Sequence, residues 1–347
     1  MLDSEQVRFG VMGAGWFASR RHIPDICKNP NAVLSALCRR DPAALDTLNR
    51  HFQPEHVYTD WRECLEKCPL DAVVIATPHN LHFVPAKAAL ERGIHVLLEK
   101  PMTIQSDEAH ALCELARDKG LHLSVALNPP FWSHCHTIKG AISDGELGSI
   151  EGISFFWSGD ARPLFGRAAV PGNLPGVVPP SLFRADTDAN GGGYLIDGGS
   201  HLISEILWTT GFRATRVSCQ MDSVPNDIRT AVNLTLSNEA LASIVSLGDS
   251  DHDGRRVHNT FSGSRGAINV EGFEFQTTIK CGDESVSFTE RELPPVPGPV
   301  DNLVDAIRGK ARLASSGEHG AHVVEVIEAC YESARCGRTI ELADCGL

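Results

Sequence analysis

The sequence predicts an α/β protein in which an N-terminal doubly wound parallel sheet is followed by an α+β domain with a mostly antiparallel sheet. Its length of 347 residues suggests two domains of about 150 residues each. Short apolar runs alternate with helical stretches up to about residue 126, as in a parallel sheet with crossover helices. Strand-like segments with short connections follow. We therefore expect one domain over 1–126 and a second over 127–347.

Six apolar segments of the first domain are expected to be strands. They are Val7–Met12, Val33–Cys38, Val57–Tyr58, Ala72–Ala76, Ile94–Leu98 and Leu121–Ala126. Five helices are expected between these strands. The first begins near Trp16, the second begins at Pro42 after the capping residue Asp41, and the third runs through Trp61. The last two cover Asn80–Arg92 and Ser106–Lys119. These two helices are followed by Gly93 and Gly120, the residue type that most often follows a helix.

The second domain is expected to begin with a helix and then to build its sheet. Its helices are expected over Trp132–Asp144, Tyr194–Thr210, Val300–Arg308 and Gly317–Arg335. Its strands are expected over Ile150–Trp157, Arg216–Met221, Thr230–Leu236, Leu241–Leu247, Val257–Gly263, Ala267–Val270, Phe273–Lys280, Val286–Phe288 and Thr339–Leu342. The segment 158–190 is rich in Pro, Gly and Arg and too long for an ordinary loop, so we expect it to be functional or to be partly ordered by a substrate or partner.

The charge balance excludes two classes of partner. With 31 Lys and Arg against 44 Asp and Glu, the net charge is −13, whereas nucleic acids and anionic membranes require a basic face. No apolar run reaches the ~18 residues of a membrane span. Met1–Val11 carries acidic residues and lacks the long apolar core of a secretory signal. We expect a cytoplasmic protein with no nucleic-acid or membrane partner.

The 11 cysteines do not indicate a disulfide framework or a zinc ribbon. Their number is odd, and no C-x-x-C occurs. Most have apolar neighbours and are expected to be small buried hydrophobes. The run His134-Cys135-His136 resembles metal ligands, but adjacent side chains on a helix or strand point in different directions, so one ion could hardly bind all three. We expect no metal site.

A dinucleotide-binding loop is predicted directly after the first strand. The run Gly13-Ala14-Gly15-Trp16-Phe17-Ala18 matches G-x-G-x-x-A between a strand and a helix. Gly13 permits the tight turn, Gly15 lets the backbone approach a pyrophosphate, and Ala18 lets the helix lie close to the strand. The helix N-terminus then offers amide donors to the phosphates.

The end of the second strand favours NADP over NAD weakly. NAD-binding proteins usually place Asp or Glu there, to bind the ribose hydroxyl. Here the strand is followed by Arg39 and Arg40, whose guanidinium groups suit a 2′-phosphate. Alternatively, these arginines stack on the adenine or face solvent, so NAD is not excluded.

Three further groups of polar residues lie where chemistry is expected. Ala76-Thr77-Pro78-His79-Asn80 with His82 follows the fourth strand, and Glu99-Lys100-Pro101 follows the fifth, at the sheet edge where open α/β folds bind ligands. The third group is Gly191-Gly192-Gly193-Tyr194-Leu195-Ile196-Asp197-Gly198-Gly199-Ser200-His201. On a helix, Asp197 and His201 would share one face, so the carboxylate could orient the imidazole.

Together these motifs resemble the glucose–fructose oxidoreductase/inositol dehydrogenase/MocA family over nearly the whole chain. The resemblance implies an N-terminal Rossmann domain in which the motif residues named above contact a bound NAD(P). It implies a C-terminal domain with a large open sheet, through which homodimers or homotetramers form. It also implies that Lys100, Asp197 and His201 are catalytic and that Pro101 follows a cis peptide bond. The family often has an Arg soon after Asn128, where this chain has Pro129-Pro130-Phe131-Trp132.

Residue chemistry agrees with the catalytic assignment. Oxidation of a secondary alcohol needs a base. Histidine as a residue type titrates near neutrality, so His201 is the natural base, and Asp197 can hold its tautomer. Lys100 can stabilise the alkoxide or share the proton relay. For substrate binding, Asn128 is a candidate, Phe131 and Trp132 offer an apolar face to a sugar ring, and Arg162, Arg167 and Arg184 could bind an anionic group or form salt bridges.

We therefore expect an NAD(P)-dependent oxidoreductase that acts on a secondary hydroxyl of a sugar, inositol or related polyol. A glycosidase that oxidises a ring hydroxyl transiently, eliminates the aglycone and returns the hydride would use nearly the same residues. A non-catalytic cofactor sensor is a third alternative, and the presence of the catalytic set counts against it.

Overall fold

The computed structural model describes residues 6–168 and 176–343, which form two compact units. The first comprises Met1–Ala126, Pro163–Asn190 and Pro297–Ala321, and the second comprises Leu127–Arg162, Gly191–Val296 and His322–Leu347. The first change of unit thus falls after Ala126. Two later segments pack with the first unit, although the sequence boundary assigns all of 127–347 to the second domain.

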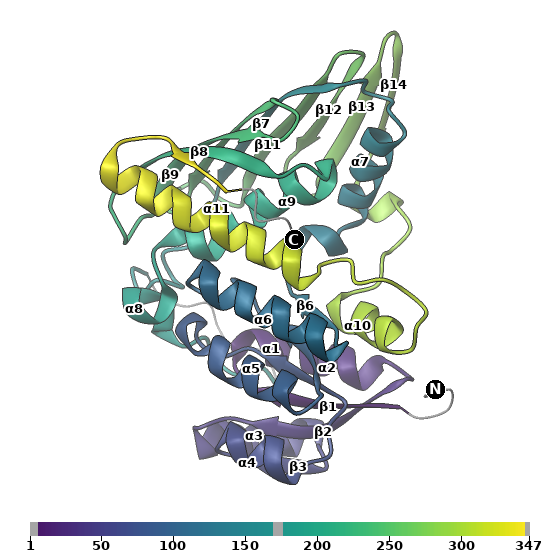
Figure 1. Cartoon of the computed structure of the whole chain (residues 1–347), viewed down its shortest axis with the longest axis vertical. Helices are drawn as coiled ribbons and strands as arrows, with labels where there is room; N and C mark the ends of the chain where they lie inside the picture. Colours follow the sequence, from purple (N-terminus) through teal and green to yellow (C-terminus); the bar gives the residue numbers. More distant parts are fainter. Residues whose placement is uncertain (1–5, 169–175, 344–347) are drawn as a thin grey trace. The chain divides into compact units, whose positions relative to one another are not determined.

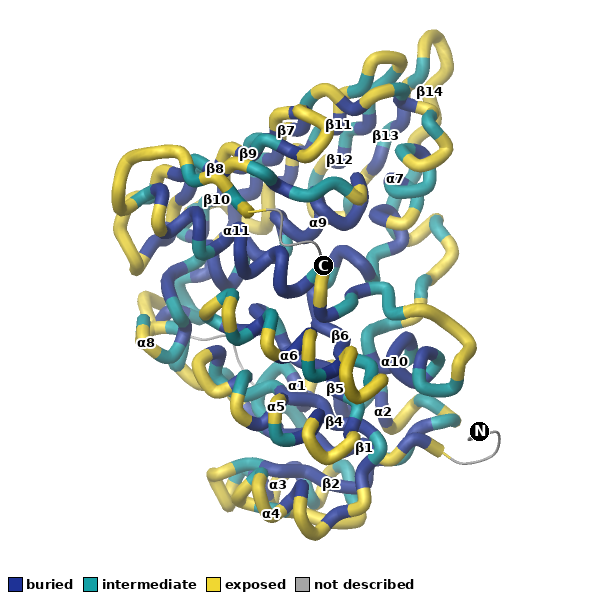
Figure 2. Tube along the Cα trace, viewed as in Figure 1, coloured by how far each residue is buried: buried dark blue, intermediate teal, exposed yellow. Residues whose placement is uncertain are grey.

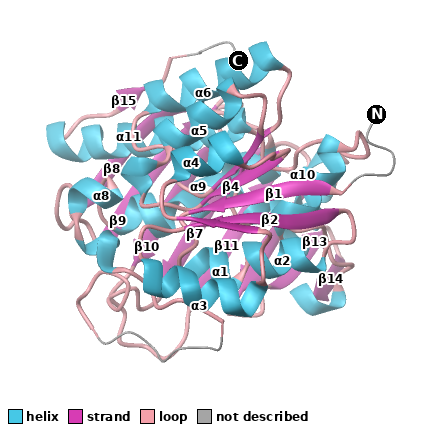
Figure 3. Cartoon of the chain, turned by 90° about the horizontal axis from the view of Figure 1, so that it is seen from below, coloured by secondary structure: helices cyan, strands magenta, loops and turns pink. Residues whose placement is uncertain are grey.

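The first unit contains a six-stranded parallel sheet in the order β3-β2-β1-β4-β5-β6 within the described residues. Its strands are β1 (Val7–Met12), β2 (Ala32–Cys38), β3 (His56–Tyr58), β4 (Ala72–Ile75), β5 (His95–Leu98) and β6 (Leu123–Val125). Its helices include α1 (Trp16–Arg20), α2 (His22–Lys28), α3 (Pro42–Phe52), α4 (Trp61–Lys67), α5 (Phe83–Glu91), α6 (Ser106–Lys119) and α10 (Pro299–Ile307). Helices cover both faces of this sheet (Figure 3). The predicted doubly wound fold is confirmed.

The core of the first unit explains why its central strands are so apolar. All residues of β4 are buried, as expected for a strand covered on both faces. Phe9 of β1 and Leu97 of β5 lie in one apolar cluster with Val300, Leu303 and Val304 of α10. A segment near the end of the sequence thus completes the core around the first strand.

Two helices of the first unit differ from the prediction. The helix near Trp16 ends at Arg20, and α2 begins at His22 because the backbone of Arg21 departs from helical geometry. The helix expected over Asn80–Arg92 is a short 3-10 turn, η1 (His79–Leu81), followed by α5. By contrast, α3 begins as predicted, with the Asp41 carboxylate accepting a hydrogen bond from the Ala43 amide at 3.0 Å.

The second unit contains a nine-stranded sheet in the order β14-β13-β12-β11-β7-β10-β9-β8-β15 within the described residues (Figure 1). Its strands are β7 (Ile150–Ser158), β8 (Ala214–Met221), β9 (Arg229–Leu236), β10 (Leu241–Leu247), β11 (Arg256–Gly263), β12 (Gly266–Glu271), β13 (Gln276–Cys281), β14 (Glu284–Phe288) and β15 (Ile340–Glu341). Only β7 and β10 pair in parallel, so the predicted mostly antiparallel sheet is confirmed.

Side chains along these strands alternate between buried and more exposed positions, so one face of the sheet is packed and the other is open (Figure 2). The buried face belongs to the unit that also holds α7 (Ser133–Ser143), α9 (Ser200–Thr210) and the end of α11 (Gly317–Cys336). On the other face, Leu241 of β10 is 65% exposed.

Two findings on the described residues concern their cysteines and the length of their helices. Their cysteines are free thiols and most are buried, as expected, while Cys345 lies outside the described residues. None of the helices in 6–168 and 176–343 has the length and apolar character needed to cross a membrane.

Candidate active site

The glycine loop after β1 has a shape that only glycine allows at its first position. Gly13 has φ 75°, and a Cβ there would lie 2.7 Å from the backbone of Ala76 and Thr77 after β4. Gly15 then precedes α1, and Ala18 on that helix is fully buried. The loop therefore presses against the end of β4 and leaves the amides at the start of α1 available to a phosphate.

Arg39 lies beside this loop, at the end of β2. Its Nη1 donates to the Ala14 carbonyl oxygen at 3.0 Å, and its Nε has no partner among the described residues. Burial lowers the pKa of Arg39, although Asp41 opposes the shift. The neighbouring Arg40 is exposed. Arg39 thus stabilises the loop, and both arginines sit where an adenosine phosphate is predicted.

The loops after β4 and β5 are joined by His82. Its Nδ1 is 2.8 Å from the Pro101 carbonyl oxygen, and its Nε2 is 2.9 Å from the Thr77 carbonyl oxygen. Burial lowers the pKa of His82 despite these contacts. The Lys100–Pro101 peptide bond is cis, as the resemblance implies. His82 therefore positions the two loops, and its contact with the cofactor stays a prediction.

His79 also contacts protein within the first unit. Its Nδ1 is 2.9 Å from the Asn190 carbonyl oxygen, and its ring packs edge-on against Phe183. Both partners belong to the segment predicted to be functional, which here includes η3 (Leu182–Ala185) and α8 (Thr187–Asn190). Residues 169–175 of that segment lie outside the described residues. His79 thus anchors this segment, while Asn80 is exposed.

The Glu99 carboxylate holds the backbone at Lys100 in place. His22 Nε2 lies 2.6 Å from Glu99 Oε1, and the Lys100 amide donates to Oε2 at 3.1 Å. Burial raises the pKa of Glu99, but the hydrogen bond and charge of His22 outweigh it and the pKa lies below its usual range. Glu99 is therefore an ionised anchor at the base of the candidate catalytic Lys100.

In the second unit, a buried carboxylate organises the glycine-rich turn. Asp227 accepts hydrogen bonds from the amides of Gly193 and Leu195, at 3.2 and 2.7 Å, and from the Tyr331 hydroxyl at 2.7 Å. A Cβ at Gly193 would lie 2.1 Å from the Asp227 backbone oxygen, so glycine is required there. Burial raises the pKa of Asp227 to about 6, even though these donors oppose the shift.

The turn leads into a π-helix, Leu195–Gly199, and then into α9. The sequence predicts a helix over Tyr194–Thr210, and the structure is helical over these residues, although Leu195–Gly199 have π geometry. Asp197 lies in the wide turn and is buried, and His201 is the second residue of α9. Such wide turns are often found at functional sites. The backbone amide of Asn128 donates to His201 Nδ1 at 3.3 Å.

The candidate substrate residues do not all fall in one unit. Arg167 and Arg184 belong to the first unit, whereas Arg162 belongs to the second with Asn128, Phe131 and Trp132. The Arg184 guanidinium lies over the Phe183 ring. The Trp132 ring stacks on His134 and packs against Phe275. Their roles in substrate binding stay predictions.

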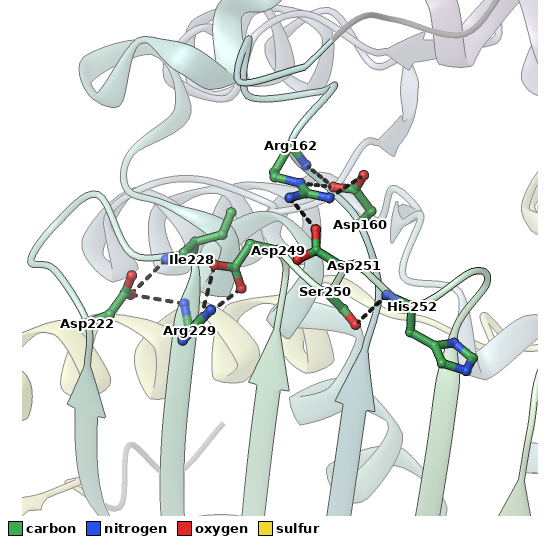
Figure 4. Close-up of polar contacts among 9 residues, drawn as sticks. All are labelled: Asp160, Arg162, Asp222, Ile228, Arg229, Asp249, Ser250, Asp251 and His252. Carbon is green, nitrogen blue, oxygen red and sulfur yellow. Dashed lines mark hydrogen bonds and ion pairs between the residues drawn. The ribbon is translucent and has the colours of Figure 1, made fainter.

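Arg162 is part of a network of ion pairs at the ends of neighbouring strands (Figure 4). Its guanidinium bonds Asp160 and Asp251, both at 2.8 Å, and hydrogen bonds to these two carboxylates raise its pKa. Beside it, Arg229 bonds Asp249 at 2.8 Å. An anionic substrate would have to replace carboxylates that already bind Arg162, so this geometry favours the salt-bridge alternative.

Comparison with known families decides the classification. Residues 7–127 match the model of an oxidoreductase family with an NAD-binding Rossmann fold, and residues 135–269 match the GFO/IDH/MocA C-terminal domain. The chain belongs to the Gfo/Idh/MocA oxidoreductase family.

Relatives of this Gfo/Idh/MocA chain include named dehydrogenases of similar length. D-glucoside 3-dehydrogenase of Escherichia coli is 24% identical, over 98% of this chain and 99% of its own. The NADP(+)-dependent scyllo-inositol 2-dehydrogenase of Bacillus subtilis is 24% identical, over 97% of this chain and 96% of its own. Levoglucosan dehydrogenase, solved with NADH and levoglucosan, shares the fold at a TM-score of 0.83 and 19% identity, covering 98% of this chain and all of that one.

Sequence reasoning missed the residues that support these motifs. His22 follows the glycine loop in the sequence, but its pairing with Glu99 has no local signature. Asp227 and Tyr331 lie far along the chain from the turn that they hold. A buried acid and a tyrosine are unremarkable in a single sequence, so only the tertiary contacts reveal their role.

We expect Gly13→Ala to weaken cofactor binding roughly tenfold or more, equivalent to about 1.4 kcal/mol, because the added methyl group collides with the backbone after β4. Fluorescence titration with NADH and NADPH measures this change. Gly93→Ala is the matched control: Gly93 has φ 78°, but a Cβ there meets nothing within 4 Å. Equal binding by both variants would show that the collision is irrelevant.

We expect Tyr331→Phe to lower the free energy of unfolding by about 1–3 kcal/mol, because Asp227 loses a hydrogen-bond donor. The pKa of Asp227 already lies above its ordinary 3.8, so the folded state binds the extra proton and stability falls as pH rises from about 4 to about 6. Loss of the donor raises that pKa further, so the variant should lose more stability at pH 8 than at pH 5.

Urea unfolding at both pH values measures the effect of Tyr331→Phe. Tyr58→Phe, which makes the same chemical change on the half-exposed strand β3, should stay within about 0.5 kcal/mol of the wild type. A pH-independent loss in Tyr331→Phe would contradict the assignment to Asp227.

Proposed function

We propose that this protein is an NAD(P)-dependent dehydrogenase that acts on a secondary hydroxyl of a sugar, inositol or related polyol. The observation that carries the proposal is the shape of the glycine loop, in which the missing side chain at Gly13 leaves the backbone in contact with Ala76 and Thr77. Relatives that align over nearly their full length are named for the oxidation of a glucoside and of scyllo-inositol, which supports this substrate class.

The loop residues fit a bound dinucleotide, which supplies the acceptor or donor of hydride. The amides at the start of α1 would bind the phosphates, and Arg39 and Arg40 would contact the adenosine end. Ionised Glu99, paired with His22, holds the backbone of Lys100. Lys100, Asp197 and His201 then handle the proton of the substrate hydroxyl.

The contact at His201 refines its role. The Asn128 amide donates to Nδ1, so that nitrogen uses its lone pair and the proton of the neutral ring sits on Nε2. His201 therefore offers an N–H donor that stabilises negative charge on the reacting oxygen. The sequence assigns His201 as the base, which would require the opposite tautomer. We therefore propose that the hydroxyl proton passes to Lys100, which requires its amine to be uncharged when the substrate binds, because an ammonium group has no lone pair.

Three further predictions concern the preferred cofactor, the oligomeric state and the cellular location. Arg39 and Arg40 favour NADP, because two guanidinium groups suit a 2′-phosphate. The open sheet face, with exposed Leu241, favours a homodimer or homotetramer formed through the C-terminal sheet. The cytoplasmic location stays a prediction from the sequence.

We expect Lys100→Met to lower kcat by about a thousandfold while cofactor binding persists, because proton transfer contributes 10²–10⁴-fold.

His201→Gln should retain at least about tenfold more activity than His201→Ala, because the Gln amide keeps a donor near Nε2. Absorbance of NAD(P)H, with a panel of sugars, inositols and glycosides, measures the turnover. Equal loss in both His201 variants would support His201 as the base, and sugar release without net NAD(P)H would indicate the glycosidase.

We expect a lower KM for NADP than for NAD, and Arg40→Ala should raise the KM for NADP about tenfold while leaving that for NAD unchanged, because one charge-assisted hydrogen bond is lost. Arg39→Ala is the comparison variant: it should weaken both cofactors, because Arg39 also bonds the Ala14 carbonyl. A strong preference of the wild type for NAD would contradict the assignment.

A further inference from the structure

Three potential metal ligands converge in the interior of the second unit. His134 and Cys135 lie in the first turn of α7, and Glu205 lies in α9. Each is at most 1% exposed, and one ligand atom from each lies within 4.8 Å of the other two. His134 Nε2 is 3.4 Å from Cys135 Sγ. The structure also separates His136 from this cluster, because its Nε2 bonds the Pro130 carbonyl instead.

The imidazole of His134 is held in the orientation that a metal ligand needs. Its Nδ1 lies 2.6 Å from Glu290 Oε2, and its ring stacks on Phe275. The backbone amides of Ser133 and His134 also donate to the Glu290 carboxylate, at 2.6 and 2.8 Å, so this carboxylate is an acceptor. It therefore accepts the Nδ1 proton and leaves Nε2 as a lone-pair donor directed at Cys135, as in carboxylate–histidine–zinc triads.

The Glu205 carboxylate is only half satisfied by protein groups. Oε1 accepts a hydrogen bond from Asn259 Nδ2 at 3.2 Å. Glu205 Oε2 and Asn259 Oδ1 are both buried and have no partner among the described residues. Buried polar oxygens are normally hydrogen-bonded or bound to a cation, so these two oxygens point to a ligand that protein groups do not supply.

We propose that His134 Nε2, Cys135 Sγ and the Glu205 carboxylate bind a zinc ion in the second unit, with Asn259 Oδ1 or a water in the fourth position. Thiolate, imidazole and carboxylate are the three side-chain ligands that zinc prefers. Ligands of tetrahedral zinc are about 3.3–3.7 Å apart, which matches the 3.4 Å between His134 and Cys135. Zinc binds cysteine as the thiolate and glutamate as the carboxylate, so Cys135 and Glu205 would supply two negative charges that neutralise Zn²⁺ in the buried interior.

This ion would tie together the start of α7, the middle of α9 and strand β11, which carries Asn259. Glu205 lies one helical turn after His201, and the segment that begins at Asn128 leads into His134. The zinc would therefore link this segment to α9 close to the hydrogen bond between the Asn128 amide and His201. Metal binding itself does not depend on the proposed dehydrogenase function, so the two proposals can fail separately.

The test measures metal in the full-length protein, expressed with added Zn²⁺, freed of any affinity tag and dialysed against a weak chelator. Elemental analysis should find one zinc ion per chain in the wild type and loss of that zinc in Cys135→Ala and Glu205→Gln. Cys64→Ala, which alters a fully buried cysteine of α4, is the matched control and should keep the zinc. A strong chelator should lower the unfolding midpoint of the wild type by several degrees and leave Glu205→Gln unchanged.

A cobalt experiment keeps the proposal testable if the variants fail to fold. Wild-type protein reconstituted with Co²⁺ should show thiolate-to-cobalt charge-transfer absorption, which requires a cysteine ligand. Absence of that band, together with no zinc and a midpoint insensitive to chelator, would overturn the site and leave a proton-sharing network of His134, Cys135 and Glu205. Zinc retained equally by the wild type and both ligand variants would be an adventitious ion and would also overturn it.

Discussion

The hydrogen bonds to the buried carboxylate of Asp227 are the contact on which the second unit's candidate groups depend. They hold the glycine-rich turn from which the π-helix and α9 begin. Without that carboxylate, the buried Leu195 amide would lose this acceptor, and the Gly193 amide would keep only its bond to the Tyr331 hydroxyl. The first unit uses the same solution, because Glu99 holds the backbone at Lys100 and is itself held by His22. In both units a buried acid holds the backbone next to candidate catalytic residues.

Parallel strand order provides the second constraint. Adjacent strands β1, β4 and β5 end at the same edge of the sheet, so their loops are neighbours although they are far apart in sequence. The close fit of Gly13 against Ala76 and the bridge from His82 to Pro101 are local results of that arrangement. The loops after β1, β4 and β5 are therefore connected by direct contacts, so a substitution in one loop can displace the next.

Local patterns predicted most of the fold because strands, caps and glycine turns are encoded by neighbouring residues. The first-unit strands, the cap at Asp41 and the glycine loop are examples. Sequence reasoning failed where distant residues decide: Asp227 and Tyr331 at the turn, and Glu205 beside His134 and Cys135. The wide turn at Asp197 also has no local signal. Side-chain contacts of this kind depend on tertiary packing, which periodicity cannot report.

The late arrival of α10 in the first core bears on how the chain is made. Val300, Leu303 and Val304 leave the ribosome long after Phe9 and Leu97, against which their cluster is packed. During most of translation, the apolar residues of the first unit that pack against α10 therefore have no α10 to cover them, although N-terminal domains often fold first. For the same reason a fragment ending near residue 126 would expose that face and tend to aggregate. Each unit is built from three separate segments of the chain, so a single cut in the sequence cannot separate the two units.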